Sequence, residues 1–278
     1  MKPAAFELAL PASLDAALEL LARHCGSARP LAGGQTLVPV MNLRLATPEW
    51  LIDLNGIAEL AGIGVDDQHL RIGAMTRQAE LLSDARVRSH APLLAQAARY
   101  IGHVQTRARG TVGGSLAHAD PAAELPLVMV ALDAVIQVAS ARGIRAIPAR
   151  QFFQHALVTA LASDELITAV EVPIAPAGAR AAFRELSRRH GDFALVAVAV
   201  QRDGTRLSAA VGGLEGTPRY CAELVAALAG RDLHGSDIKG LVSAALAGAT
   251  ALDDFHASGP YRRHLATVLL CDALRELA

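Results

Sequence analysis

Apolar and polar residues alternate along several short stretches of this chain, and two of the stretches are divided by a polar centre. Residues 62–75 alternate on both sides of a pair of aspartates, and residues 134–149 do so around an Arg-Gly pair. Such alternation is typical of strands with one buried face, and the polar centre is typical of a turn. Each stretch therefore predicts an antiparallel hairpin, and residues 164–174 predict a further strand.

The C-terminal part of the chain changes from strand patterns to helix patterns. Strands are expected at residues 181–189, 193–201 and 205–214, and helices at residues 222–230, 236–249 and 260–277. Runs of strands followed by runs of helices indicate an α+β fold, here ending in a three-stranded antiparallel sheet and a helical bundle. A length of 278 residues favours two domains. The stretch 173–180, with its prolines and alanines, is the best linker candidate, so we expect a boundary near residue 176.

The composition excludes several classes of function. The net charge is −1 and aromatic residues make up 4%, so the basic surface and the stacking rings of a nucleic-acid-binding protein are missing. The most apolar stretches are interrupted or far shorter than the ~20 residues that cross a bilayer. The N-terminal stretch also lacks the uninterrupted apolar core of a signal peptide. We therefore expect a cytoplasmic protein with no membrane span and no nucleic-acid partner.

The cysteines argue against a metal cluster in this chain. Cys25, Cys221 and Cys271 are widely spaced and form no Cys-x-x-Cys pair. An iron–sulfur cluster or a zinc ribbon needs about four ligands, which these residues cannot supply alone. We interpret all three as buried thiols in a reducing compartment.

Two short segments, 31–37 (LAGGQTL) and 111–115 (TVGGS), each place adjacent glycines beside hydroxyl or amide side chains. Glycine permits positive φ and has no Cβ, so successive main-chain N–H groups can converge on one anion. Gln35, Thr36, Thr111 and Ser115 could add side-chain donors. The pattern is consistent with two turns that bind the two phosphates of one pyrophosphate. It is also consistent with ordinary turns, because the chain contains 23 glycines.

Other motifs give weaker indications of function. The Gly-Ile-Gly sequence at 62–64 does not continue into a dinucleotide-binding fingerprint, because an aspartate stands where the third glycine is needed. His118, Asp120 and Glu124 are close in sequence and leave a metal site open, although no second His/Glu pair is nearby. Ser115 lies outside a Gly-x-Ser-x-Gly elbow, which argues against a serine hydrolase.

The glycine segments belong to a longer, ordered set of motifs. The set comprises LAGGQTLVPVMNLRL, LIDLN, IGHVQTRARGTVGGSLAHADPAAELP, ELITAVEVP, FRELSRRHGDFA and YRR. Together these motifs resemble the FAD-binding medium subunit of molybdenum hydroxylases, the flavoprotein of the carbon monoxide dehydrogenase and xanthine dehydrogenase family. The resemblance implies a two-lobed FAD-binding domain of the vanillyl-alcohol oxidase type at 1–176, with lobes at about 1–57 and 58–176. It implies the family's small C-terminal flavoprotein domain at 177–278.

The resemblance also implies a set of FAD-binding residues. The two glycine segments would grip the pyrophosphate of one FAD from two lobes. Their residues are Leu31, Ala32, Gly33, Gly34, Gln35, Thr36, Leu37, Thr111, Val112, Gly113, Gly114 and Ser115.

Five residues outside the glycine segments match further cofactor positions of the family. Glu124 would accept hydrogen bonds from the adenosine ribose, and Ile101 and Leu166 would line the cofactor. Arg184 stands where relatives often carry lysine, near the polar edge of the flavin, and Phe193 matches a position beside the isoalloxazine ring. The resemblance implies no acid–base residue and no metal ligand in this chain.

The function implied by the resemblance is electron transfer within a complex. Electrons would pass from a molybdenum–pterin centre in a large subunit, through two [2Fe–2S] clusters in a small subunit, to FAD in this chain and then to an external acceptor. The assembly would be a dimer of heterotrimers. Two alternatives stay open at this point. One is a self-sufficient flavin oxidase, and the other is a non-catalytic subunit whose glycine turns bind a nucleotide during assembly.

Overall fold

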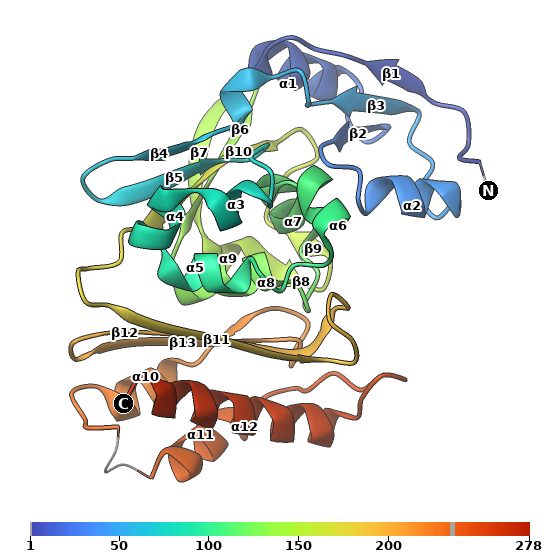
Figure 1. Ribbon diagram of the computed structural model, residues 1–278. Coiled ribbons are helices and arrows are strands. Elements are labelled where there is room, and N and C mark those ends of the chain that lie inside the picture. The colour runs from blue at the N-terminus through green and yellow to red at the C-terminus, as the bar shows by residue number, and fades with distance from the viewer. Residues whose placement is uncertain (1, 234–236) are drawn as a thin grey trace.

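The N-terminal residues form a small parallel sheet flanked by two helices. The computed structural model describes residues 2–233 and 237–278 (Figure 1). Strands β1 (Glu7–Ala9), β3 (Trp50–Asp53) and β2 (Ala28–Leu31) lie in that order, with α1 (Leu14–Arg23) and α2 (Leu37–Asn42) beside them. Ser13 accepts a hydrogen bond from the N–H of Ala16 and so caps α1, as its place before an apolar-periodic stretch predicts. The edge strand β1 was not predicted.

A central antiparallel sheet follows, and it contains both predicted hairpins. Its strand order is β4 (Ile63–Val65), β5 (His69–Gly73), β10 (Leu166–Pro173), β6 (Val135–Ser140) and β7 (Gly143–Pro148). The pairs β4–β5 and β6–β7 are the hairpins that the alternation predicted, and β10 joins them as the third predicted stretch. Strand β10 is buried along most of its length because it lies in the middle of the sheet.

Short helices cover one side of the central sheet. They are α3 (Glu80–Ser83), α4 (Ala85–His90), α5 (Pro92–Ala97), α6 (Val104–Arg109), α7 (Val112–His118), α8 (Glu124–Ala131) and α9 (Ala149–Phe152). A one-turn 3₁₀ helix (Ala58–Leu60) precedes them, and a small hairpin of β8 (Phe153–His155) and β9 (Val158–Thr159) follows α9. All eight residues of α8 are buried, which is the expected pattern for a helix that is apolar all round.

The C-terminal part is a sheet with a layer of helices on its far side. The strands are β11 (Arg180–Ser187), β12 (Ala194–Asp203), β13 (Arg206–Gly212) and β14 (Arg219–Tyr220), and the helices are α10 (Ala222–Leu228), α11 (Ile238–Leu246) and α12 (Gly259–Glu276). The three expected strands and three expected helices are confirmed, but the sheet has a fourth strand. Two residues are too few to produce a visible alternation, so β14 had no signal in the sequence. Ser236, the predicted start of the second helix, lies outside the described residues.

The C-terminal sheet is covered on both faces. Figure 1 shows α5 and α8 above it and α12 below it. Side chains of β11 point alternately to the two sides: Phe183 joins the apolar core that contains α5 and α8, whereas Ala182 joins the core beneath α12. The sheet therefore shares one core with the preceding residues and another with its own helices.

Candidate cofactor site

The first glycine segment leaves β2 and enters α2. Gly33 is buried, and Gly34 has φ +70°, a backbone conformation that favours glycine. The main-chain N–H groups of residues 33–36 donate to no protein acceptor in the described part of the chain. Four consecutive free donors beside a helix start form the kind of site that an anion can occupy.

The second glycine segment has a different structure from the one predicted. Gly113 and Gly114 lie in the first turn of α7, and Thr111 caps that helix by accepting from the N–H of Gly114 at 3.1 Å. The N–H of Gly113 donates to the carbonyl of Ala74 at 2.7 Å, and the N–H of Val112 donates within the protein as well. The prediction of a second bare turn is therefore wrong, because these amides already have partners.

The glycines of α7 serve close packing instead of a turn. A Cβ on Gly113 would lie 2.6 Å from the Cβ of Ala74, so only glycine lets the helix start lie this close to the end of β5. A Cβ on Gly114 would lie 3.6 Å from the Cβ of Ala32 in the first segment. Gly114 therefore faces the first glycine segment, and a side chain there would enter the space between the two.

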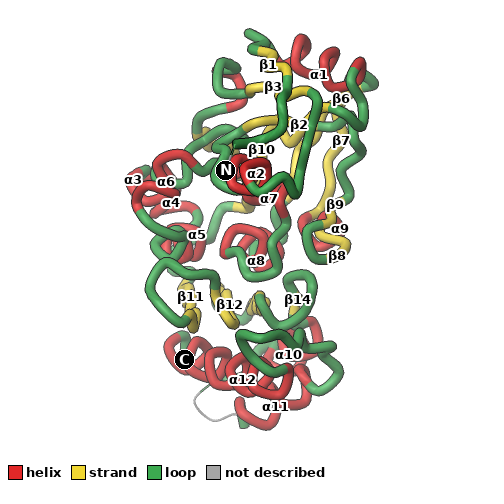
Figure 2. Tube along the Cα trace, turned by 90° about the vertical axis from the view of Figure 1, so that its right-hand side faces the viewer, coloured by secondary structure: helices red, strands yellow, loops and turns green. Residues whose placement is uncertain are grey.

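The two glycine segments lie side by side although they are far apart in the sequence. A Cβ on Gly33 would lie 2.8 Å from the Cα of Gly110, just before the second segment. Figure 1 shows α2 on the same side of the molecule as α6 and α7, and in Figure 2 α2 lies in front of α7. The segments thus face a common region, as binding of one diphosphate by both of them requires.

A chain of polar contacts that was not predicted joins the two segments. Arg77 donates through Nη1 to the carbonyl of Arg109 and through Nη2 to Oδ1 of Asn55 at 2.6 Å. The Nδ2 of Asn55 donates to the carbonyl of Ala32 at 3.0 Å and to the carboxylate of Asp53. Asn55 follows β3 and Arg77 follows β5, so these hydrogen bonds link the N-terminal sheet to the central sheet next to the glycine segments.

Glu124 and Ile101 lie near one another behind the second segment. Glu124 is the first residue of α8, and burial raises the pKa of its carboxyl to about 7, with the nearby Arg107 opposing the shift. Arg107 donates to the carbonyls of Ile101 and Gly102 at 2.7 and 2.8 Å. Ile101 is buried in the core that contains α8. The arrangement therefore holds a carboxyl with a raised pKa close to an apolar wall.

Strand β11 turns Arg184 away from this region and turns Glu185 toward it. Arg184 pairs with Glu276 of α12 at 2.6 Å, on the same side of the strand as Ala182. Glu185 shares its side with Phe183, and its Oε2 is buried with no hydrogen-bond partner in the described residues. Burial and the charge of Glu124 raise the pKa of Glu185 to about 8. Strand alternation was the signal that could have identified Glu185 from the sequence.

The remaining predicted residues fall on two sides of the glycine segments. Leu166 is buried in the N-terminal core, against which Ala32 packs. Phe193 is 63% exposed in the turn between β11 and β12. That turn contacts the start of α6, because a Cβ on Gly191 would lie 2.6 Å from Nδ1 of His103.

Comparison with known proteins identifies the family. The protein-family model described as "FAD binding domain in molybdopterin dehydrogenase" matches residues 4–175. The family model described as "CO dehydrogenase flavoprotein C-terminal domain" matches residues 181–277. The chain belongs to the FAD-binding medium subunits of molybdenum hydroxylases. Members of this family are subunits of oxidoreductases.

Relatives of this FAD-binding subunit match it over nearly its whole length. Subunit alpha of the 6-hydroxypseudooxynicotine dehydrogenase complex of Paenarthrobacter nicotinovorans is 40% identical over 97% of this chain and 93% of its own. The glyceraldehyde dehydrogenase medium chain of Sulfolobus acidocaldarius is 35% identical over 100% of both chains. A solved structure of carbon monoxide dehydrogenase from Hydrogenophaga pseudoflava matches with a TM-score of 0.95 at 35% identity, covering 99% of this chain and 98% of that one.

Other predictions about the subunit have mixed outcomes. Cys221 and Cys271 are buried as expected, but Cys25 is exposed. His118 lies 3.9 Å from Asp120, yet the described residues contain no group of His, Cys, Asp or Glu that could hold a metal ion, so the metal alternative gains no support. Among the described helices, none has the length and hydropathy needed to span a bilayer.

Proposed function

We propose that the chain is the electron-transfer subunit of a molybdenum hydroxylase and binds one FAD between its two glycine segments. FAD would receive electrons from [2Fe–2S] clusters of a small subunit and pass them to an external acceptor. A large subunit would hold the molybdenum–pterin centre. The complex would be a cytoplasmic dimer of heterotrimers. The observation that carries the proposal is the close approach of the two glycine segments, next to four main-chain donors that have no protein acceptor within residues 2–233 and 237–278.

The proposed binding site divides the cofactor between several elements. The free N–H groups at 33–36 would bind the diphosphate, and the bare helix start at Gly114 would let the cofactor backbone approach closely. Glu124 would accept from ribose hydroxyls, which is a suitable role for a buried carboxyl at the start of α8. Ile101, Leu166 and Phe193 would line the flavin side.

Arg184 is not part of the proposed site. Its guanidinium pairs with Glu276 on the opposite side of β11. The orphaned Oε2 of Glu185 is a better candidate for a cofactor contact, because a buried acceptor without a donor is costly unless a ligand supplies one.

The chain's own residues supply binding and orientation, and the flavin supplies the redox chemistry when it is bound. We propose an FAD-binding domain at 1–176, with lobes built on the N-terminal sheet (about 1–57) and the central sheet (58–176). The C-terminal domain would extend over 177–278. It would close the site from the side of Glu185 and Phe193.

The proposal is tested by purifying the native complex and analysing its cofactors. We expect a yellow-brown protein that releases one FAD per copy of this chain on denaturation, with molybdenum and iron in the partner chains. A colourless chain that takes up no FAD would favour the nucleotide-binding assembly subunit. A lone yellow chain that turns over a small substrate with oxygen would favour the self-sufficient oxidase.

A further inference from the structure

Arg77 occupies an unusual place, because its half-buried guanidinium links two main-chain carbonyls from separate parts of the fold, one at the end of α6 and one just after β2. It reaches the carbonyl of Arg109 directly and the carbonyl of Ala32 through Asn55. Each of these carbonyls belongs to the peptide that precedes a glycine, Gly110 in one case and Gly33 in the other. Asn55 ends the LIDLN motif and Arg77 lies outside the ordered motifs, and the motifs give neither residue a role in this arrangement.

The contact to Ala32 has a geometric consequence for Gly33. The peptide between the two residues is planar and trans, so its N–H points opposite to its C=O. When Asn55 holds the carbonyl of Ala32 on one side, the N–H of Gly33 is directed to the other side. That N–H is one of the four donors without a protein partner.

We propose that Arg77 and Asn55 form a latch that fixes the two glycine segments against each other and aims the Gly33 N–H at the diphosphate of FAD. This inference rests on the proposed function. Arg77 and Asn55 are positioning residues, since neither needs to touch the cofactor. The latch predicts that FAD affinity depends on the fork geometry of Arg77, and that a positive charge alone is not enough.

A lysine substitution separates geometry from charge. In Arg77→Lys the charge is kept, but a single ammonium cannot reproduce the planar fork that holds Asn55 and the Arg109 carbonyl together. In Arg77→Gln both the charge and the fork are lost. If the latch is correct, Arg77→Lys resembles Arg77→Gln. If Arg77 acts only as a distant positive charge, Arg77→Lys resembles the unmodified protein, and the latch is overturned.

The experiment titrates the full-length apoprotein with FAD and, separately, with riboflavin, which has no phosphates. We expect Arg77→Gln and Arg77→Lys to raise the Kd for FAD at least tenfold and to change the Kd for riboflavin less than twofold. A general structural defect would raise the Kd for FAD and the Kd for riboflavin by similar factors. Equal FAD affinity in the variants and the unmodified protein would also overturn the latch.

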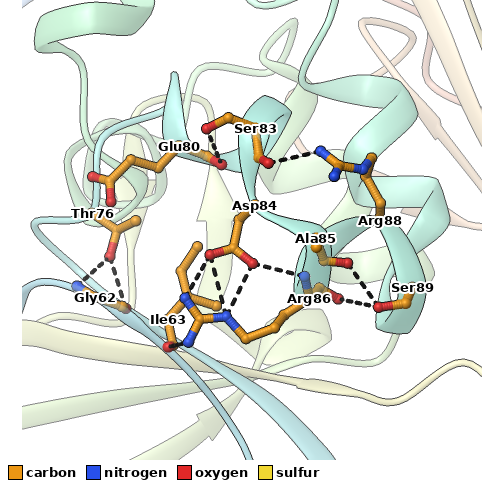
Figure 3. A network of polar contacts seen from close by, with 10 residues as sticks. All are labelled: Gly62, Ile63, Thr76, Glu80, Ser83, Asp84, Ala85, Arg86, Arg88 and Ser89. Atoms are coloured by element: carbon orange, nitrogen blue, oxygen red, sulfur yellow. Dashed lines mark hydrogen bonds and ion pairs between the residues drawn. The ribbon is translucent and has the colours of Figure 1, made fainter.

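The matched control is Arg86→Gln. Arg86 also joins a main-chain carbonyl, that of Ile63, to a neighbouring side chain, Asp84, and its hydrogen bonds within the described residues do not reach a glycine segment (Figure 3). Its loss should lower the melting temperature about as much as Arg77→Gln does and leave the FAD Kd unchanged. A rise in Kd equal to that of Arg77→Gln would show that the effect is not specific to the latch.

Asn55→Ala keeps the test informative if Arg77 variants fail to fold. Asn55 is exposed, so its side chain contributes little to the core. We expect Asn55→Ala to raise the FAD Kd about as much as Arg77→Gln does. The double variant Asn55→Ala/Arg77→Gln should have an FAD Kd no more than twofold above that of the worse single variant, because both residues act through one chain of contacts. Unmodified protein that binds no FAD would contradict the proposed function instead. Unmodified protein that binds FAD while Asn55→Ala binds it equally well would contradict the latch alone.

Discussion

Gly33 and Gly110 pack so closely that a methyl group on Gly33 would lie 2.8 Å from the Cα of Gly110. Gly33 follows β2 and Gly110 lies between α6 and α7, and a Cβ on Gly33 would meet main-chain atoms of both Arg109 and Gly110. Neither glycine can therefore move away without moving a segment of backbone.

Gly33→Ala should therefore separate the segments. The added Cβ also meets the carbonyl of Arg109, and overpacking of this kind costs about 1–3 kcal/mol. We expect a lower melting temperature together with loss of FAD, measured as flavin absorbance per protein after gel filtration. Gly64→Ala is the control, because a Cβ there meets nothing within 4 Å. Retention of FAD by Gly33→Ala would argue against a diphosphate site at this point.

Gly114→Val should remove FAD and leave the C-terminal sheet folded. The side chain would fill the space between α7 and Ala32, where the cofactor is proposed to approach. Flavin content and limited proteolysis of the C-terminal half would measure the two effects separately. Gly248→Val provides the comparison, since a Cβ at that position is in open space. Normal flavin content in Gly114→Val would contradict the assignment of this helix start to the site.

The stability of the apoprotein should fall as pH rises from about 4.5 to about 8. The pKa values of Glu124 and Glu185, about 7 and about 8 in the folded chain, lie above the ordinary value of 4.5. In that range the unfolded chain has already released these protons while the folded chain still holds them. Each group can therefore lower the free energy of unfolding by at most about 1.4 kcal/mol per pH unit.

Glu185→Gln tests this assignment through the slope of melting temperature against pH. The amide is neutral at every pH, so the slope should become flatter and the protein more stable at pH 8.5. Glu19→Gln, at an exposed position on α1, should leave the slope unchanged. An unchanged slope in Glu185→Gln would mean that this carboxyl ionises normally in the folded chain.

Arg262 should be essential for the C-terminal sheet. It is 4% exposed, donates to the carbonyls of Leu195 and Gly213, and pairs with Asp254 at 2.8 Å. Arg262→Met would leave these buried carbonyls without their donor, at a cost of about 1–3 kcal/mol for each. Denaturant unfolding measures the decrease in the free energy of unfolding. Arg275→Met, at an exposed arginine, should lower that free energy much less. Equal losses would contradict the structural role of Arg262.

The sequence predicts the strands better than it predicts the helix starts, and the reason is physical. The hairpins at 62–75 and 134–149 carry alternation and turn residues locally, so no distant contact is needed to recognise them. The segment at 111–115 carries two glycines that look like a turn. The structure gives a different cause: a Cβ on Gly113 would meet the distant Ala74, and a Cβ on Gly114 would meet Thr111 and Ala32.

Some residues of the candidate site could be predicted from the sequence and others could not, for the same physical reason. The glycine segments and Glu124 could be proposed from ordered motifs. The contacts of Arg77 and Asn55 could not, although Asn55 ends the LIDLN motif, because the main-chain carbonyls that they bind leave no trace in the identity of the bonded residues. The predicted role of Arg184 rests on the resemblance and on the charge that it shares with lysine, whereas the direction of a strand side chain depends on register, and Glu185 shares the side of β11 on which Phe183 lies.

The two-sided burial of the C-terminal sheet limits how the subunit can be dissected. Phe183, Ala197 and Ala210 pack in the same core as α5 and α8 of the preceding half. A fragment that stops at residue 176 would therefore expose the apolar surface of those helices and aggregate. Exchange of the C-terminal sheet and its helices between related enzymes would succeed only where the apolar surface of α5 and α8 is exchanged as well.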